Sequence, residues 1–178
     1  FYCIGNEPLL HDRQNIQKVH DYVKKLAPAM KAADPTIKIF IFEECDLFEE
    51  QHRRIIGGDL DLTGKDKNGN WMVDGITFHR YPGARDRNHV VFSGPGDIRF
   101  KTKMLMEMVD YANNKHKRSG DSKLRWGLTE FNVTTSNPDR EISGIGNTSF
   151  LGGQFIAEIY GIGMEYGAFT MNPWCISE

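Results

Sequence analysis

The sequence predicts an α/β fold built around a parallel sheet. Five short apolar segments rich in β-forming residues alternate with four longer helical segments along the 178 residues. Such alternation is typical of right-handed strand-helix-strand units. The strand segments are apolar along most of their length, as expected for strands that are buried on both faces. A chain of this length normally forms one domain with its own core.

The first part of the chain is predicted as strand, helix and strand. Residues 1–5 form a short strand, and residues 12–33 form a helix that ends just before Pro35. The apolar residues of this helix recur on one face, which comprises Ile16, Val19, Val23, Leu26 and Met30. Residues 37–42 are β-branched or aromatic except for one lysine, and they predict the second strand.

The middle of the chain is predicted as a short helix over residues 46–56, a polar loop over 59–70 and a third strand over 72–79. The polar loop has the aspartate and asparagine spacing of a calcium loop. Its twelfth position from Asp59 is Asn70 rather than glutamate, so we expect a turn instead of a calcium site. Residues 80–96 are predicted as a long loop.

The last part of the chain adds a helix over residues 97–117, a strand over 124–130, a helix over 148–165 and a strand over 168–171. Two architectures fit this order of elements: a doubly wound open sheet and an eight-stranded barrel. No glycine-rich phosphate loop follows any strand, so a nucleotide-binding sheet has little support. A barrel has eight strands and about 250 residues, so this chain would hold its strands four to eight.

Composition narrows the possible functions. A net charge of -2 argues against a general binder of nucleic acid or of a membrane surface. No apolar stretch approaches the roughly 18 to 20 residues of a membrane-spanning helix. The three cysteines form no CxxC pair and are expected to be free thiols, and the six histidines have no metal-ligand spacing. We therefore predict no cofactor and no catalytic metal.

Two glutamates stand where predicted strands end. Glu7 follows the first strand, and Glu130 ends the fourth. The carboxyl ends of parallel strands lie at one edge of a sheet, so both side chains are expected at that edge. Cleavage of a glycosidic bond needs one carboxylic acid to protonate the leaving oxygen and a second carboxylate near the anomeric carbon. The pair therefore predicts a glycoside hydrolase.

Three segments, residues 4–8, 75–82 and 128–131, carry a resemblance to a known group of enzymes. Together they resemble the clan of retaining glycoside hydrolases that have a (β/α)8 barrel and two glutamates after strands four and seven. The resemblance implies that residues 1–178 are the C-terminal part of one catalytic TIM barrel, with strands one to three missing. Residues 42–44 are more distantly similar to enzymes that degrade marine galactans such as agar and porphyran.

The resemblance also implies roles for six residues. Glu7 would be the general acid/base and Glu130 the nucleophile. Asn6 would hold the sugar 2-hydroxyl, and His79 and Tyr81 would line the sugar subsite, with Tyr81 bonding the nucleophile. Trp174 would be a stacking platform, because an indole face packs well on the C–H face of a sugar. The substrate would be a polysaccharide or an oligosaccharide.

Several alternatives remain open on the sequence alone. The barrel could bind carbohydrate without cleaving it. Glu43 and Glu44 are either a solvated pair or substrate contacts. The loop over residues 80–89 carries three arginines that suit an acidic polysaccharide, because guanidinium groups bind sulfate and carboxylate, but it could also be an ordinary charged loop.

The glycosylation sequon at Asn132 bears on the source of the protein, because a glycan beside Glu130 would obstruct the site. This favours a bacterial protein, and we expect it to be secreted or periplasmic. Without the N-terminal part of its barrel, the chain is expected to be inactive.

Overall fold

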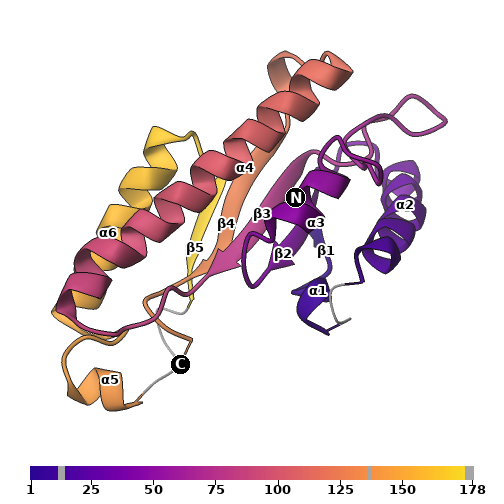
Figure 1. Ribbon diagram of the computed structural model, residues 1–178. Helices are drawn as coiled ribbons and strands as arrows, with labels where there is room; N and C mark the ends of the chain where they lie inside the picture. The colour runs from indigo at the N-terminus through magenta and orange to yellow at the C-terminus, as the bar shows by residue number, and fades with distance from the viewer. Residues whose placement is uncertain (12–14, 136–137, 175–178) are drawn as a thin grey trace.

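The computed structural model describes residues 1–11, 15–135 and 138–174, which form a five-stranded sheet with helices between its strands (Figure 1). The strands are β1 (Tyr2–Ile4), β2 (Ile39–Glu44), β3 (Gly75–Arg80), β4 (Arg125–Phe131) and β5 (Thr170–Pro173). Their order in the sheet is β1-β2-β3-β4-β5, and each neighbouring pair is parallel. The predicted α/β fold with a parallel sheet is confirmed.

The strand order decides between the two architectures. A doubly wound sheet reverses its strand order at a switch point, whereas this sheet follows the chain from β1 to β5 without a reversal. Successive right-handed connections that advance in one direction leave their helices on one face of the sheet. Figure 1 shows the long helices along one side of a twisted, curved sheet. The doubly wound alternative is therefore wrong.

The helices follow the predicted positions with four additions. They are α1 (Pro8–His11), α2 (Ile16–Ala33), α3 (Glu49–Ile55), the π-helical turn η1 (His89–Ser93), α4 (Gly94–His116), the 3-10 turn η2 (Gly120–Ser122), α5 (Pro138–Ile142) and α6 (Phe150–Glu165). Side chains cap two of them: Asn15 accepts from the Lys18 amide at the start of α2, and Ser149 accepts from the Gly152 amide at the start of α6. In the described part of the chain, no helix has both the length and the apolar character to cross a membrane.

Several predicted boundaries are corrected by the structure. The start of the predicted helix 12–33 falls partly on residues 12–14, which lie outside the described residues. Leu26 was expected to face inward but is 44% exposed, because the helical turn brings Ala27 to the buried face instead. The predicted loop 80–96 is helical from His89 onward, because the π-helical turn η1 passes directly into α4, which carries Pro95 near its start. The loop 59–70 does contain the expected turn, in which Asp66 accepts from the amides of Asn68 and Asn70.

The sheet curves enough to bring distant strands into contact. In a flat sheet β2 and β5 would lie about 14 Å apart, because neighbouring strands are separated by about 4.8 Å. The ring centroids of Phe40 on β2 and Phe169, just before β5, are nevertheless 5.1 Å apart. Phe1, just before β1, lies 5.0 Å from Phe40 and 5.4 Å from Phe169. These rings fill the concave side near the start of the strands, as side chains fill the interior of a barrel.

Gly75 in β3 makes room for one of these rings, and we expect it to be sensitive to substitution. A Cβ atom at this position would lie 2.2 Å from the Phe40 ring, which is fully buried. Gly75→Ala should lower the free energy of unfolding by about 1–3 kcal/mol through overpacking. Gly153→Ala is the matched control, since its Cβ would enter open space on α6. Urea denaturation measures both, and equal stability of the two variants would contradict this account of Gly75.

Candidate active site

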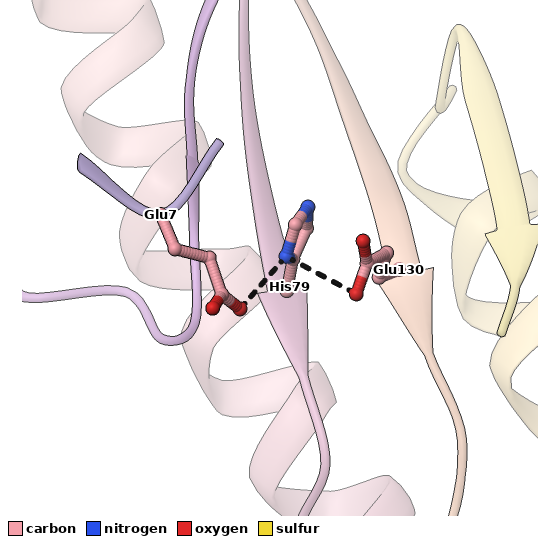
Figure 2. A group of neighbouring side chains, drawn as sticks. All are labelled: Glu7, His79 and Glu130. Atoms are coloured by element: carbon pink, nitrogen blue, oxygen red, sulfur yellow. Dashed lines mark hydrogen bonds and ion pairs between the residues drawn. The ribbon is translucent and has the colours of Figure 1, made fainter. Parts of the chain in front are cut away.

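Three titratable side chains meet at the carboxyl edge of the sheet. Glu7 follows β1, His79 lies near the end of β3, and Glu130 lies near the end of β4. Figure 2 shows the imidazole of His79 between the two carboxylates. His79 Nδ1 is 3.1 Å from Glu7 Oε1 and 3.5 Å from Glu130 Oε2. Two glutamates more than 120 positions apart in the sequence thus converge on one histidine.

The register between β3 and β4 places His79 beside Glu130. The two residues are paired across the parallel strands, directly after an irregularity in the register between Phe78 and His79. Such irregularities redirect side chains and are common next to active sites. Tyr81, just beyond β3, donates its hydroxyl to Glu130 Oε2 at 2.9 Å. Glu130 is therefore held from the β3 side by Tyr81 and faces His79 as well.

Glu7 is presented by an unusual turn. Its φ angle is 45°, and Gly5 before it has a φ angle of 92°. The Glu7 amide donates to the Glu43 carbonyl at 2.8 Å, which ties this turn to the end of β2. Phe42 and Glu43 also have positive φ angles of 92° and 40°. Positive φ in residues other than glycine costs free energy and is concentrated at functional sites, so the surrounding structure must hold this turn in place.

The three side chains differ in their exposure. The side chain of His79 is 1% exposed, whereas those of Glu7 and Glu130 are 19% and 23% exposed and can meet a substrate. With a hydrogen on Nδ1, His79 donates to Glu7 and also faces Glu130. Its Nε2 atom is buried and has no hydrogen-bond partner among the described residues. The buried imidazole is therefore positioned to orient both carboxylates, which are themselves partly exposed.

The spacing of the carboxylates favours one kind of chemistry. One oxygen of Glu7, one of Glu130 and a nitrogen of His79 all lie within 4.8 Å of one another. Retaining glycosidases hold their carboxyl groups about 5–5.5 Å apart, whereas inverting ones leave about 6.5–9.5 Å for a water molecule. The same three atoms could also ligate a divalent cation, so the expected absence of a catalytic metal stays a prediction.

The remaining two predicted site residues lie at the same edge of the sheet. Asn6 precedes Glu7 in its turn and is exposed. Trp174 follows β5 and is 51% exposed. Its amide donates to the Phe131 carbonyl at 2.9 Å, and its carbonyl accepts from Asn132 Nδ2 at 2.7 Å. The backbone of Trp174 is thus joined to β4 one and two residues beyond Glu130.

Other residues near this edge differ from the sequence-based expectations. Glu44 is fully buried, so neither a solvated pair nor an exposed substrate contact describes it. The register of β2 against β3 shifts between Phe42 and Glu44, so residue spacing along the strand gave no signal of this burial. Arg80 is held by Asp46 and Asp97, while Arg85 and Arg87 are exposed. Cys3 and Cys45 are free thiols as expected, and Cys175 lies outside the described residues.

Comparisons with known proteins address the fold. No protein-family model and no curated protein matches the chain. Among solved structures, a family 44 endoglucanase from Clostridium thermocellum has a TM-score of 0.66 at 16% identity, over 97% of this chain and 42% of that one. A family 44 xyloglucanase from Paenibacillus polymyxa has a TM-score of 0.66 at 12% identity, over 99% and 42%. A family 51 α-L-arabinofuranosidase from Bifidobacterium longum has a TM-score of 0.56 at 16% identity, over 90% and 30%.

These likenesses at low identity show the fold alone. The neighbours are glycoside hydrolases with TIM barrels, and this chain spans 42% or less of their length. That share fits the prediction of a partial barrel, and the sequential parallel sheet with its helices on one side fits it as well. The chain therefore has an α/β fold that matches part of the barrel of glycoside hydrolases.

Proposed function

We propose that the protein containing this chain is a glycosidase that cleaves O-glycosidic bonds with retention of configuration. The observation that carries the proposal is the convergence of Glu7 and Glu130 on His79, at 3.1 and 3.5 Å. The pair comes from separate strand ends at the edge where barrel enzymes place their chemistry. The likeness to known glycoside hydrolases supports the same function.

In the first step, Glu130 attacks the anomeric carbon while Glu7 gives its proton to the departing glycosidic oxygen. The bond from the anomeric carbon to that oxygen breaks, and an ester bond to Glu130 forms. Tyr81 donates to the same Glu130 oxygen that faces His79, so it orients the attacking carboxylate. Asn6 would bond the sugar 2-hydroxyl, and Trp174 would support the sugar ring by stacking.

In the second step, Glu7 takes a proton from water as the water oxygen attacks the anomeric carbon. The ester bond to Glu130 breaks, Glu130 leaves as a carboxylate and Glu7 is protonated again. Two inversions at one carbon give net retention. His79 contacts Glu7 in this arrangement and keeps the acid/base on the side of the site that faces Glu130.

Residues 1–178 would supply strands four to eight of the barrel, and the N-terminal part of the same barrel would supply the rest of the cleft. We expect the chain to be inactive without that part, because one wall of the sugar-binding cleft would be absent. Tyr2, the first residue of β1, and Phe1 just before it are exposed on the edge strand that the preceding barrel strand would cover.

The substrate would be a polysaccharide or an oligosaccharide. Exposed Arg85 and Arg87, in the loop that follows β3, suit a sulfated or carboxylated chain such as a marine galactan. One of the structural neighbours is described with bound xyloglucan, a neutral polysaccharide. A panel of substrates should therefore include agar, porphyran, xyloglucan and cellulose, and a clear preference for the neutral chains would remove the proposal of an acidic substrate.

The decisive experiment is proton NMR of the first product released by the intact protein from a substrate of known anomeric configuration. We expect the first-formed anomer to have the configuration of the substrate. An inverted first anomer would contradict the nucleophilic role of Glu130. Binding of a polysaccharide without cleavage of any member of the panel would instead favour the non-catalytic carbohydrate-binding alternative.

A further inference from the structure

A third carboxyl group lies behind the proposed site, and no step of the mechanism uses it. Glu44 is the last residue of β2 and is fully buried. Its Oε1 atom accepts a hydrogen bond from the Leu9 amide at 2.8 Å. Its Oε2 atom is buried and has no partner among the described residues. A buried carboxyl group with one unpartnered oxygen costs free energy, so its presence in the fold needs an explanation.

The hydrogen bond from Glu44 fixes the segment that follows Glu7. Leu9 lies in α1, two residues beyond Glu7, and α1 begins directly after Glu7. The other connection between this segment and β2 is the bond from the Glu7 amide to the Glu43 carbonyl at 2.8 Å. Two hydrogen bonds to the end of β2 thus hold this turn, one from the Glu7 amide and one from the Leu9 amide two residues later. Because the φ angle of Glu7 is 45°, the turn depends on such external bonds.

We propose that Glu44 is a positioning residue for Glu7, which it acts on through the hydrogen bond to α1 and through its charge. This inference rests on the proposed acid/base role of Glu7. A carboxyl group at this place holds the turn at a geometry that aims Glu7 at His79, whose Nδ1 atom is 3.1 Å from Glu7 Oε1. It does not touch the substrate or the reacting atoms.

The electrostatic surroundings of Glu44 fit this role. Burial, together with the charge on Glu7, raises the pKa of Glu44 to about 7, against the opposing effect of the bond from the Leu9 amide. Cys45, the next residue, has its own pKa raised by burial and by the charges of Glu7, Glu44 and Asp46. From β3, the residue paired with Glu44 is the non-titratable Phe78.

Helix α3, which packs against Phe42 of the same strand, contributes a neutral group. His52 of α3 stacks on the Phe42 ring and has its pKa lowered to about 4 by burial, so it carries no charge near neutral pH. Glu7 is therefore the charged group that acts most directly on Glu44. The ionisation of one carboxyl discourages that of the other.

Two variants in the intact protein separate the hydrogen bond from the charge. Glu44→Gln keeps an oxygen that can accept from Leu9 but cannot ionise. We expect its kcat to stay within about threefold at the pH optimum, because the hydrogen bond that holds the turn is kept. Glu44→Ala also removes the hydrogen bond, and we expect kcat to fall roughly 10- to 100-fold with little change in KM. Glu49→Gln, on the exposed face of α3, is the control and should change neither quantity.

A titration that needs no activity keeps this inference separate from the proposed function. Because the charge on Glu7 raises the pKa of Glu44, carboxyl carbon NMR should show the midpoint of the Glu44 titration at lower pH in Glu7→Gln than in the unchanged protein. Wild-type kcat in Glu44→Ala, or an unmoved Glu44 titration in Glu7→Gln, would overturn the proposal. If Glu44→Ala does not fold, the Glu44 titration decides it. A moved titration in a protein that cleaves no glycan would contradict the hydrolase function and leave the coupling standing.

Discussion

Replacing Glu130 by alanine is expected to lower kcat by roughly 10⁴-fold or more, because loss of a nucleophile removes the covalent step itself. The effect should be measured in the intact protein with both a polysaccharide and an aryl glycoside. An aryl leaving group departs without much help from an acid, so its hydrolysis isolates the contribution of the nucleophile. Loss of activity on both substrates is expected for Glu130→Ala.

Glu7→Ala is the matched variant, and the expected pattern differs. Hydrolysis of the polysaccharide should fall by roughly 10²- to 10⁴-fold, the usual contribution of a general acid. Formation of the glycosyl-enzyme from an aryl glycoside should fall much less. The two glutamates have similar exposure and both face His79, so a difference between the substrates reports their roles rather than general damage to the site.

Azide tests the two roles by stereochemistry. In Glu130→Ala the small anion can occupy the space of the missing carboxylate and attack the anomeric carbon directly, which gives a glycosyl azide of inverted configuration. In Glu7→Ala it attacks the glycosyl-enzyme from the opposite side, which gives a retained product. Exchange of these two outcomes between the variants would mean that the acid/base and nucleophile assignments are reversed.

Asp74→Ala is expected to lower the free energy of unfolding by about 3–5 kcal/mol, the usual cost of leaving a buried charge without its partner. Asp74 and Lys31 have side chains that are only 10% and 9% exposed, with 2.7 Å between Oδ2 and Nζ. The same Asp74 oxygen accepts from the Ile39 amide at 2.9 Å. One carboxylate thus joins α2, β2 and the segment that leads into β3. Urea denaturation of the intact protein measures the loss.

A double-mutant cycle and an exposed pair provide the controls. Lys31→Met combined with Asp74→Leu should be less destabilising than the sum of the single changes, because the double variant leaves no buried charge unpaired. The ion pair of Arg54 and Asp59 has side chains that are 37% and 62% exposed, and its removal should cost less than about 1 kcal/mol. Additive single changes at positions 31 and 74 would show that burial does not couple them.

Most strands and long helices could be predicted because their local sequences favour a single structure. The predicted strand 124–130 corresponds to β4 (Arg125–Phe131), and the predicted helix 148–165 contains α6 (Phe150–Glu165) with Ser149 as its cap. The start of α4 could not be predicted in the same way. Glycine and proline near its first turn normally indicate a loop, and only packing against neighbouring segments shows that they begin a helix.

The candidate site also has a part that could be predicted from the sequence and a part that could not. The joint pattern indicated Glu7 and Glu130, since both glutamates stand at the ends of predicted strands in the order and with the flanking residues of the resembled clan. The bridging position of His79 depends on the register of β3 against β4 and on the irregularity after Phe78. The burial of Glu44 depends on α1 covering the end of β2. Neither of these arrangements can be inferred from the spacing of residues along the chain.

The sequence by itself determined which segments become strands or helices and which acids stand at strand ends, because those properties depend on near neighbours in the chain. Only the tertiary structure decided that the sheet curves, that Phe40 meets Phe169 across it and that Glu7 and Glu130 share one histidine. The curvature of the sheet accumulates from small rotations between neighbouring strands, and the register depends on how those strands pair. They therefore follow from the packing of the whole sheet and its helices rather than from any one segment.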